Sequence, residues 1–223
     1  MGKFVNARQT CVAPDYVLVL DKIVVDFVEH LRTAVNDFYG DDPKASPDFP
    51  RIINEHHFDR IIGLIDSGNI AFGGETDHAG CYIAPTVLMD TPPDSPIMSE
   101  EIFGPIPPVL TVFNIEEAIA FVNERSKPLA LYLFSNNKET RDKVIDETSS
   151  GGICVNDVVT HLVVPELPFG GVGPSGMGAY HGYASFRTFS HAKGVLPKSE
   201  HFEIPLRYPP YTDSKFKWLK RLT

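Results

Sequence analysis

Short apolar runs with strand character alternate with helical periodicity along most of this 223-residue chain, and this alternation restricts its fold more than any other feature. Residues 16–20 form an apolar run rich in branched side chains, which is typical of a buried strand. Apolar side chains then recur at helical spacing from Ile23 to Phe38, and Gly40 is placed to end that helix. The alternation continues to Val164 and predicts a layered α/β fold with a largely parallel sheet.

The same patterns place the remaining elements. We expect helices over residues 51–66, 115–124 and 138–148, and strands over residues 69–72, 82–83, 86–89, 109–113, 129–135, 153–155 and 158–164. Asn114, followed three residues later by Glu117, predicts a capping box at the start of the second of these helices. The strand over residues 129–135 is continuously apolar and is expected to be buried, and residues 73–77 are expected to form a turn.

The character of the sequence changes after residue 164. Six glycines fall between residues 170 and 182, and three prolines follow between residues 205 and 210. Both residue types favour turns and loops over regular elements. We therefore divide the chain into a domain of residues 1–164 and a glycine- and proline-rich tail of residues 165–223.

Charge and cysteine content exclude several classes of protein. The chain has 20 Lys and Arg side chains against 29 Asp and Glu, a net charge of −9 that argues against nucleic-acid binding. No apolar run is long enough for a membrane-spanning helix, and no signal-peptide pattern begins the sequence. Cys11, Cys81 and Cys154 are too few and too scattered for a disulfide framework or a metal site, which indicates a reducing compartment.

Two motifs that resemble known sites have simpler structural explanations. Residues 171–176 match G-x-G-x-x-G, but Pro174 interrupts the motif and no strand with an acidic end follows, so we expect a tight glycine turn. His56 and His57 have no further His or Cys at ligand spacing, so we expect solvated histidines on a helix surface. The two cysteines that adjoin predicted strands, at positions 81 and 154, are expected to be small buried apolar residues.

Two other stretches have features of a reactive site. Cys11 lies in a polar loop outside any apolar period, and the nearby charge of Arg8 would favour its thiolate, so Cys11 is a candidate nucleophile. Further along, Glu100 and Glu101 precede Phe103 and a Gly-Pro turn. A carboxylate there can accept hydrogen bonds from a ligand's hydroxyls and the aromatic ring can touch a planar group. A solvated surface turn is the alternative.

Seven motifs then occur together and in order. They are Asn-Ala-Arg-Gln-Thr-Cys-Val-Ala-Pro-Asp-Tyr (6–16), Glu-Glu-Ile-Phe-Gly-Pro (100–105), Lys-Pro-Leu-Ala-Leu-Tyr (127–132), Glu-Thr-Ser-Ser-Gly-Gly (147–152), Pro-Phe-Gly-Gly-Val-Gly (168–173), Ser-Gly-Met-Gly-Ala-Tyr-His-Gly (175–182) and Phe-Ser-His (189–191). With these motifs the chain closely resembles the C-terminal half of class 3 aldehyde dehydrogenases, which include enzymes for fatty and aromatic aldehydes. The resemblance extends from residue 1 to about residue 210.

The resemblance implies a thiol mechanism that uses NAD or NADP. Cys11 matches the family nucleophile, which forms a thiohemiacetal with the aldehyde and then a thioester that water cleaves. Glu101 matches the glutamate that binds the nicotinamide ribose, and Phe103 matches the aromatic residue beside that ribose and ring. Asn156 and His161 fall on the segment that borders the substrate pocket in the family.

Two features depart from the family pattern. The resemblance implies that the N-terminal dinucleotide-binding half, with an oxyanion-binding Asn and the general-base Glu, is missing, so little or no activity is expected of this chain alone. In addition, Arg8 stands where the family has glycine. A bulky side chain at that position is expected to crowd the loop that carries Cys11.

The resemblance also implies partners and a location. The expected substrate is an apolar aldehyde, and the expected assembly is a homodimer, with residues 165–223 as an oligomerisation tail. Residues 215–222 are basic and amphipathic and could contact an anionic membrane surface, a frayed tail being the alternative. We expect a cytoplasmic protein, either free or at the cytosolic face of the endoplasmic reticulum membrane.

Two other functions stay open. The chain could be a non-catalytic truncated isoform that pairs with full-length subunits through the tail and residues 153–164. It could also be a cysteine hydrolase that uses Cys11 and a distant His, although nothing in the sequence places a His beside Cys11.

Overall fold

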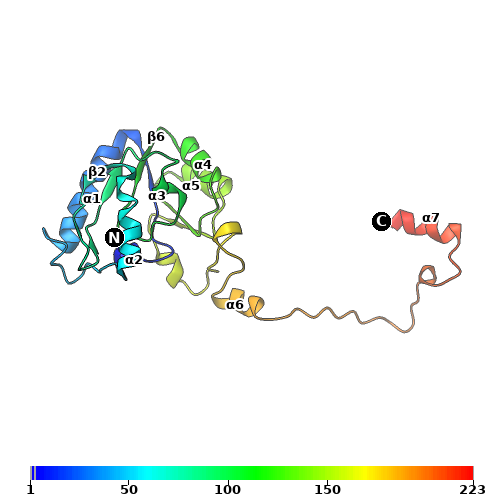
Figure 1. The fold of residues 1–223 in the computed structure, drawn as a ribbon. Coiled ribbons are helices and arrows are strands. Elements are labelled where there is room, and N and C mark those ends of the chain that lie inside the picture. Colours follow the sequence, from blue (N-terminus) through cyan, green and yellow to red (C-terminus); the bar gives the residue numbers. More distant parts are fainter. Residues whose placement is uncertain (1, 3, 223) are drawn as a thin grey trace. The chain divides into compact units, whose positions relative to one another are not determined.

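The computed structural model describes every residue except 1, 3 and 223, and it contains two compact units, Met1–Phe189 and Ser190–Thr223 (Figure 1). The predicted boundary after residue 164 falls inside the first unit, so residues 165–189 belong with the body that holds the strands. The oligomerisation role of residues 165–223 stays a prediction.

The first unit combines helices and short strands. Its helices are α1 (Val24–Tyr39), α2 (Glu55–Ile62), α3 (Pro96–Ser99), α4 (Ile115–Asn123), α5 (Lys138–Glu147) and α6 (Gly182–Thr188). Its strands are β1 (Val17–Leu20), β2 (Asn69–Phe72), β3 (Thr76–Asp77), β4 (Tyr82–Ile83), β5 (Val87–Met89), β6 (Val109–Val112), β7 (Ala130–Leu133) and β8 (Gly152–Val155). Short 3₁₀ turns lie at Val5–Arg8, Asp21–Ile23, Ile65–Ser67, Thr160–Val163 and Gly173–Ser175. Helices α4 and α5 lie together at one side of this unit, and α1 lies at the opposite side (Figure 1).

The strands pair two by two. β1 pairs with β6 and β7 pairs with β8 in parallel, with Val17 opposite Val109 and Ala130 opposite Gly152. β2 pairs with β5, and β3 pairs with β4, in antiparallel register. The predicted α/β class with parallel strand pairs is confirmed. The antiparallel β3–β4 pair arises because its short connection permits a hairpin but no parallel crossover.

Two apolar clusters form the core of the first unit. In one, Val24 and Val28 of α1 pack with Val19 of β1 and Val109 of β6. The other, larger cluster centres on α2, whose Ile61 is completely buried. Burying a side chain of this size contributes about 1.5–3 kcal/mol to folding. These two clusters hold the helices against the strand pairs.

The larger cluster also positions the acidic turn that the sequence singled out. Ile102 is buried in the same cluster as Ile61. Gly104 lies so close to α2 that a Cβ on it would be 2.8 Å from Cδ1 of Ile61. Glycine at this position therefore allows the turn after residue 101 to approach the helix.

Helix α2 is shorter at both ends than the helix predicted over residues 51–66. The N–H of Ile52 donates to the carbonyl of Cys81 (2.9 Å). The N–H of Ile53 donates to Oε1 of Gln9 (2.9 Å). These two residues therefore bind other segments of the chain, and the helix begins after them.

The strand predicted over residues 158–164 is wrong. The chain forms the 3₁₀ turn Thr160–Val163 there. Asn156 and Val159 have φ values of 60° and 68°, in the left-handed region that strands do not adopt. The chain therefore leaves the sheet at the end of β8.

Burial also differs from the prediction in places. The strand predicted over residues 129–135 is β7, which is half-buried because β7 and β8 form a two-stranded sheet, and Phe134 is 67% exposed. Residues 73–77 include strand β3 in addition to the expected turn. Cys81 and Cys154 are half-buried, whereas full burial was expected.

The predicted start of helix α4 at Asn114 and the predicted end of helix α1 at Gly40 are confirmed. Oδ1 of Asn114 accepts a hydrogen bond from the N–H of Glu117 (2.8 Å) at the start of α4. The Glu117 carboxylate accepts from the N–H of Phe113 (2.7 Å), one residue before the expected partner. Gly40 ends α1 with φ 76°.

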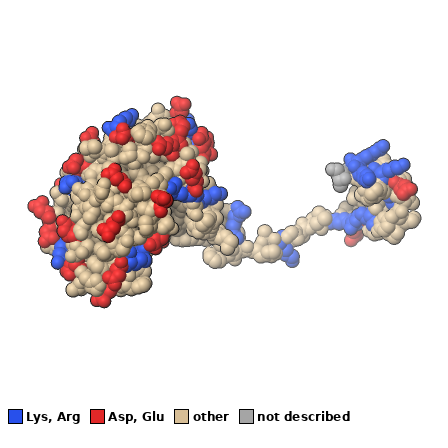
Figure 2. Space-filling view, turned by 45° about the horizontal axis from the view of Figure 1, so that its top comes forward, with Lys and Arg blue, Asp and Glu red and all other residues tan. Residues whose placement is uncertain are grey.

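The second unit contains the 3₁₀ turn Pro205–Arg207 and helix α7 (Asp213–Leu222). At helical spacing, Lys217, Lys220 and Arg221 fall on one side of α7, and Leu219 falls opposite Lys217 and Arg221. Nζ of Lys220 lies over the ring of Phe216, 4.8 Å from its centroid. Lys and Arg side chains gather around this helix in Figure 2. Among the residues that the structure describes, no helix has the length and apolar character needed to cross a membrane.

Candidate active site

The candidate nucleophile lies at the surface on a loop with firm anchors. Cys11 is exposed, whereas the next residue, Val12, is 2% exposed. The hydroxyl of Tyr132 on β7 donates to the carbonyl of Val12 (2.7 Å). On the other side, Nε2 of Gln9 donates to the carbonyl of Arg51 (3.0 Å). These anchors on both sides hold the thiol outward.

The loop begins with three consecutive left-handed residues. Asn6, Ala7 and Arg8 have φ values of 54°, 47° and 64°. Each costs roughly 1–2 kcal/mol for a residue with a Cβ. Ala7 and Arg8 are both 1% exposed. Burial of these side chains offsets the strain and fixes the path of the chain before Cys11.

Arg8 does not act as the sequence suggested. Its Nε donates to the carbonyl of Pro14 (2.8 Å), and its Nη2 pairs with Oδ1 of Asp15. The side chain is therefore folded into the interior, instead of crowding the surface of the loop. Burial lowers the pKa of Arg8 to about 9, with the charge of Glu101 opposing the shift, so the guanidinium stays charged at neutral pH.

The acidic turn lines an open hollow of ≈ 370 Å³. Its walls are His57 and Arg60 of α2 together with Glu100, Glu101 and Phe103. Phe103 has φ 50°, which turns the backbone sharply at the edge of the hollow. The hollow therefore combines a carboxylate pair, an aromatic ring and basic side chains from the adjacent helix.

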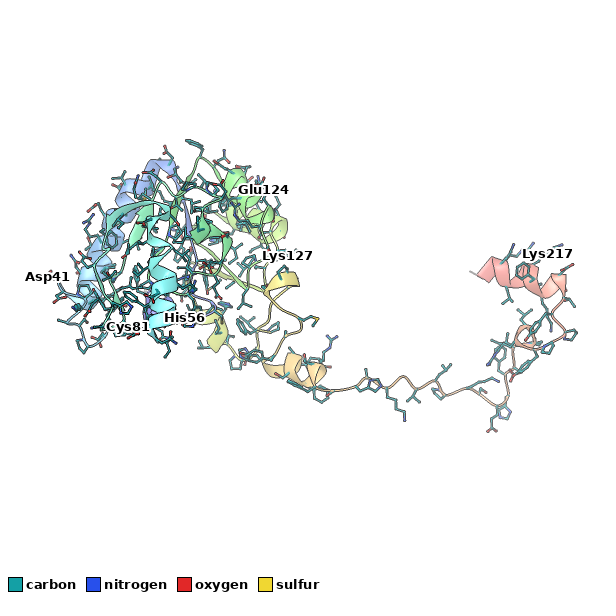
Figure 3. All side chains as sticks on the ribbon, in the orientation of Figure 1. Asp41, His56, Cys81, Glu124, Lys127 and Lys217 are labelled. Atoms are coloured by element: carbon teal, nitrogen blue, oxygen red, sulfur yellow. The ribbon has the colours of Figure 1, made fainter. Side chains whose placement is uncertain are left out.

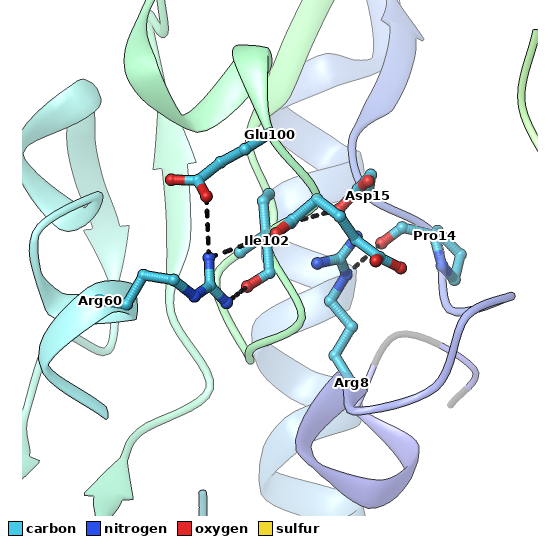
Figure 4. Close-up of polar contacts among 7 residues, drawn as sticks. Arg8, Pro14, Asp15, Arg60, Glu100 and Ile102 are labelled. Atoms are coloured by element: carbon cyan, nitrogen blue, oxygen red, sulfur yellow. Dashed lines mark hydrogen bonds and ion pairs between the residues drawn. The ribbon is translucent and has the colours of Figure 1, made fainter. Parts of the chain in front are cut away.

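Arg60 fixes the backbone of this turn. Its Nη2 donates to the carbonyl of Ile102 (2.6 Å), and its Nη1 donates to the carbonyl of Glu101 (3.3 Å). Its salt bridge is with the carboxylate of Glu100 (3.4 Å), as Figure 4 shows. The pairing with Glu100 leaves the exposed Glu101 carboxylate at the wall of the hollow.

The structure brings the two predicted stretches together. Oδ1 of Asp15, on the loop that holds Cys11, accepts a hydrogen bond from the N–H of Ile102 (3.1 Å). Ile102 stands between Glu101 and Phe103. The nucleophile loop and the acidic turn are thus joined through this hydrogen bond from the backbone of one to a side chain of the other (Figure 4).

Asn156 stabilises the backbone beside the sheet. Its Oδ1 accepts from the N–H of Ser135 (2.8 Å), and its Nδ2 donates to the carbonyl of Ser135 (3.2 Å). Both polar ends of the side chain thereby extend the β7–β8 pairing. The structure places Asn156 at the end of β8 with its amide engaged in the protein.

His161 lies in an aromatic cluster near the nucleophile loop. Its ring packs edge-on against Tyr132, at 5.8 Å between centroids, and lies 6.1 Å from Phe169. Burial lowers its pKa, and neither ring nitrogen has a partner among the described residues. Tyr132 links His161 to the nucleophile loop, because its ring packs against His161 and its hydroxyl binds the carbonyl of Val12, the residue after Cys11.

The glycine motif is structural, whereas the two paired histidines differ from each other. A Cβ on Gly171 would lie 2.1 Å from the carbonyl oxygen of Ser175, so the predicted tight turn with close backbone approach is confirmed. His56 is exposed on α2, as expected (Figure 3). His57 is half-buried and lines the hollow, which the sequence had not suggested.

Sequence reasoning did not single out Asp15, Tyr132 or Arg60. Their partners lie far along the chain, so local patterns do not reveal them. One signal was present for α2. His57 and Arg60 are three residues apart, which places them on one face of the helix. Two basic side chains on one face could have indicated that α2 packs beside the acidic turn.

Comparisons with known proteins show which family the chain is similar to. The chain matches the aldehyde dehydrogenase family over residues 1–195. It is 56% identical to aldehyde dehydrogenase family 3 member A2 of Rattus norvegicus, over 98% of the chain. It is also 56% identical to the dimeric NADP-preferring aldehyde dehydrogenase of the same species, over 94% of the chain. The predicted resemblance to class 3 aldehyde dehydrogenases is confirmed.

The fold leads to the same group. A solved structure described as the substrate-bound state of Staphylococcus aureus AldH superimposes with a TM-score of 0.86 and 49% identity, covering 99% of this chain and 48% of that one. The chain spans about half the length of the curated relatives, 46% and 47% for the two rat enzymes. On the sequence match and the shared fold, the chain belongs to the aldehyde dehydrogenase family.

Proposed function

We propose that this chain supplies the nucleophile and part of the cofactor site of an NAD- or NADP-dependent aldehyde dehydrogenase. The proposed reaction converts apolar aldehydes to carboxylic acids. One observation carries the proposal, the hydrogen bond from the N–H of Ile102 to Asp15. It joins the loop of the exposed Cys11 to the turn that bears Glu101 and Phe103.

The residues around the hollow suit a nicotinamide riboside. The carboxylate of Glu101 is an acceptor for ribose hydroxyls, and the ring of Phe103 offers an apolar face to a planar group. Nδ1 of His57 is buried without a partner among the described residues, so a polar ligand could satisfy it. We assign Glu101 and Phe103 to the ribose and ring of the cofactor, which when bound supplies the acceptor for hydride.

The chemistry at the thiol follows from its exposure. The sulfur of Cys11 adds to the aldehyde carbon, and the carbonyl π electrons move to oxygen as the carbon–sulfur bond forms. After hydride has left the carbon, a thioester remains on Cys11. Water then breaks the carbon–sulfur bond, releasing the acid and returning the thiol. Gln9 and Tyr132 serve this reaction by holding the loop at fixed points on both sides of the sulfur.

The aromatic cluster favours an apolar substrate, fatty or aromatic. Tyr132, His161 and Phe169 form a continuous ring surface that begins at the anchor of the nucleophile loop. Phe169 also packs edge-on against Tyr180, at 5.6 Å between centroids. We propose that His161 and its neighbours border the path of the aldehyde chain. Asn156 supports that border by fixing the end of β8.

We further propose that the chain alone turns over little or no aldehyde. No general base is assigned among its residues, and loss of a general base or of an oxyanion donor each lowers a rate by about 100-fold or more. A purified sample with hexanal or benzaldehyde and NAD or NADP tests this. Rates typical of complete aldehyde dehydrogenases would contradict it.

Cofactor binding tests the assigned site separately from turnover. NADH fluorescence on titration with the chain should show saturable binding that weakens in Glu101→Gln and Phe103→Ala. Glu124→Gln is the matched control, because Glu124 is an exposed acid at the end of α4, outside the hollow (Figure 3). Equal NADH binding by all of these variants would sink the assignment of Glu101 and Phe103.

We propose a homodimer as the assembly. The name of the rat relative, dimeric NADP-preferring aldehyde dehydrogenase, supports a dimer for that protein. The alternative is a non-catalytic isoform that pairs with full-length subunits. Sedimentation of the pure chain distinguishes a dimer from a monomer, and co-purification with a complete subunit without added activity would favour the alternative.

We also propose a cytoplasmic location with contact to an anionic membrane surface through α7. The clustered basic residues of this helix, together with its exposed aromatic side chains Phe216 and Trp218, support the contact.

A further inference from the structure

Ile102 is held at both of its backbone polar atoms by separate side chains. Its N–H donates to Asp15 (3.1 Å), and its carbonyl accepts from Arg60 (2.6 Å). Its own side chain is buried in the core cluster that contains Ile61. The position of the turn between Glu101 and Phe103 is therefore set by these contacts, one of which comes from the nucleophile loop.

Asp15 is in turn held by Arg8. Nη2 of Arg8 pairs with the same Oδ1 of Asp15 that accepts from Ile102, and Nε of Arg8 donates to the carbonyl of Pro14 (2.8 Å). This arrangement closes the loop of residues 8–15 at its base (Figure 4). Cys11 lies inside the loop that is closed in this way.

The buried Arg8–Asp15 pair is costly for folding, which argues that its role is to hold neighbouring residues in position. The Arg8 side chain is 2% exposed, and its Nη1 has no partner among the described residues. Its backbone is left-handed at φ 64°. A buried cation with an unsatisfied donor is weak evidence for stability. Strained residues persist where surrounding contacts over-determine them, and they cluster at functional sites.

We propose that Arg8 is a positioning residue that acts through Asp15 to hold Ile102, and with it the Glu101–Phe103 turn, in register with the Cys11 loop. The significance of this register rests on the proposed function, since it sets the cofactor turn relative to the nucleophile. The charge of Arg8 is essential to it. Without that charge, the Asp15 carboxylate is no longer balanced and leaves its place beside Ile102.

Hydrogen exchange at the Ile102 amide tests the proposal without requiring activity. In Arg8→Met the exchange of this N–H should become at least roughly tenfold faster, although its acceptor is on Asp15 and not on Arg8. The amide of Val144, buried in α5, should exchange as in the parent chain. Arg51→Met is the matched control, since Arg51 also donates to two carbonyls, those of Phe49 and Lys44, but should leave Ile102 unchanged.

The Asp15→Asn variants separate charge from shape. An asparagine retains the acceptor for Ile102 without the charge, so Arg8→Met/Asp15→Asn should recover part of the protection that Arg8→Met loses. Unchanged exchange at Ile102 in Arg8→Met would overturn the proposal, and so would equal acceleration at Ile102 and Val144. If Arg8→Met does not fold, Arg8→Lys tests the charge from the other direction, because it loses the Pro14 bond but retains the charge. The Ile102 amide should then exchange as in the parent chain, and a roughly tenfold acceleration confined to Ile102 would overturn the role of the charge.

The outcome is independent of the proposed function. If NADH binding proves insensitive to Glu101, the cofactor assignment fails while the exchange result at Ile102 still decides the role of Arg8. If NADH binds as proposed and Ile102 exchange ignores Arg8, only the positioning inference fails.

Discussion

At the scale of single residues, the three cysteines differ in how accessible their thiols are to solvent and reagents. Cys11 is exposed on an anchored loop, while Cys81 and Cys154 are half-buried. Sγ of Cys154 also lies 3.4 Å from the hydroxyl of Thr160. Since a thiol must be reached before it can react, these surroundings rank the three in accessibility.

A thiol-reactive disulfide reagent should therefore react with this protein in distinct phases. Cys11→Ser should abolish the fastest phase, whereas Cys81→Ser should retain it. Stopped-flow absorbance with the native protein and both variants measures the phases. A fast phase that survives Cys11→Ser would contradict the accessible position of the Cys11 thiol.

The half-buried His161 makes stability depend on pH. Burial lowers its pKa in the folded protein below the ordinary 6.5, so the unfolded chain takes up a proton first as the pH falls. The contribution to stability is complete above pH 6.5 and declines as the pH falls from 6.5 to the folded pKa. His161→Gln should remove this decline.

Urea unfolding of both proteins between neutral and mildly acidic pH measures the effect. The stability of the native protein relative to His161→Gln should fall as the pH decreases, because the carboxylates titrate equally in both. A difference that stays constant across this range would show that His161 is not buried in the folded protein.

At the scale of secondary-structure elements, local capping signals determined where helices begin. Asn114 caps α4 through the N–H of Glu117, as its spacing predicted. Replacement Asn114→Ala should cost about 1 kcal/mol of stability, since an orphan N–H loses its acceptor. Asn114→Asp should recover most of it, because aspartate caps as well as asparagine. Chemical denaturation measures both, and equal losses would show that the side-chain cap contributes nothing.

The elements that were placed wrongly have a common physical reason. Residues 52 and 53 have apolar side chains suited to a helix, yet their amides bind Cys81 and Gln9. Val159 has a β-branched side chain suited to a strand but takes a left-handed backbone. In each case the alternative backbone partner or turn lies outside the local window, so periodicity alone could not identify it.

At the scale of the whole molecule, charge is divided unevenly along the sequence. The second unit, Ser190–Thr223, has seven Lys and Arg against three Asp and Glu, whereas the chain has a net charge of −9. Trp218, the single tryptophan of the sequence, lies on α7 and is 58% exposed. Basic residues beside exposed aromatic side chains suit the surface of an anionic bilayer.

Trp218 therefore reports directly on the proposed membrane contact. Phosphatidylserine vesicles should shift its emission to shorter wavelength, and added salt should reverse the shift. Lys217→Glu/Lys220→Glu should abolish it (Figure 3). Lys127→Glu/Lys193→Glu changes the charge equally outside α7 and should retain it. Equal shifts with neutral phosphatidylcholine vesicles would count against an electrostatic contact.

The sequence by itself determined the α/β class, most strand and helix positions, and the polar loop that exposes Cys11, because periodicity and capping act over a few residues. Only the tertiary structure decided the assembly of the site. The bond from Ile102 to Asp15 joins residues 87 positions apart, and Arg8 turns inward to bind Pro14 and the same Asp15 carboxylate. Such contacts depend on how the core packs α2 against the acidic turn. No local sequence pattern encodes contacts between residues so far apart in the chain.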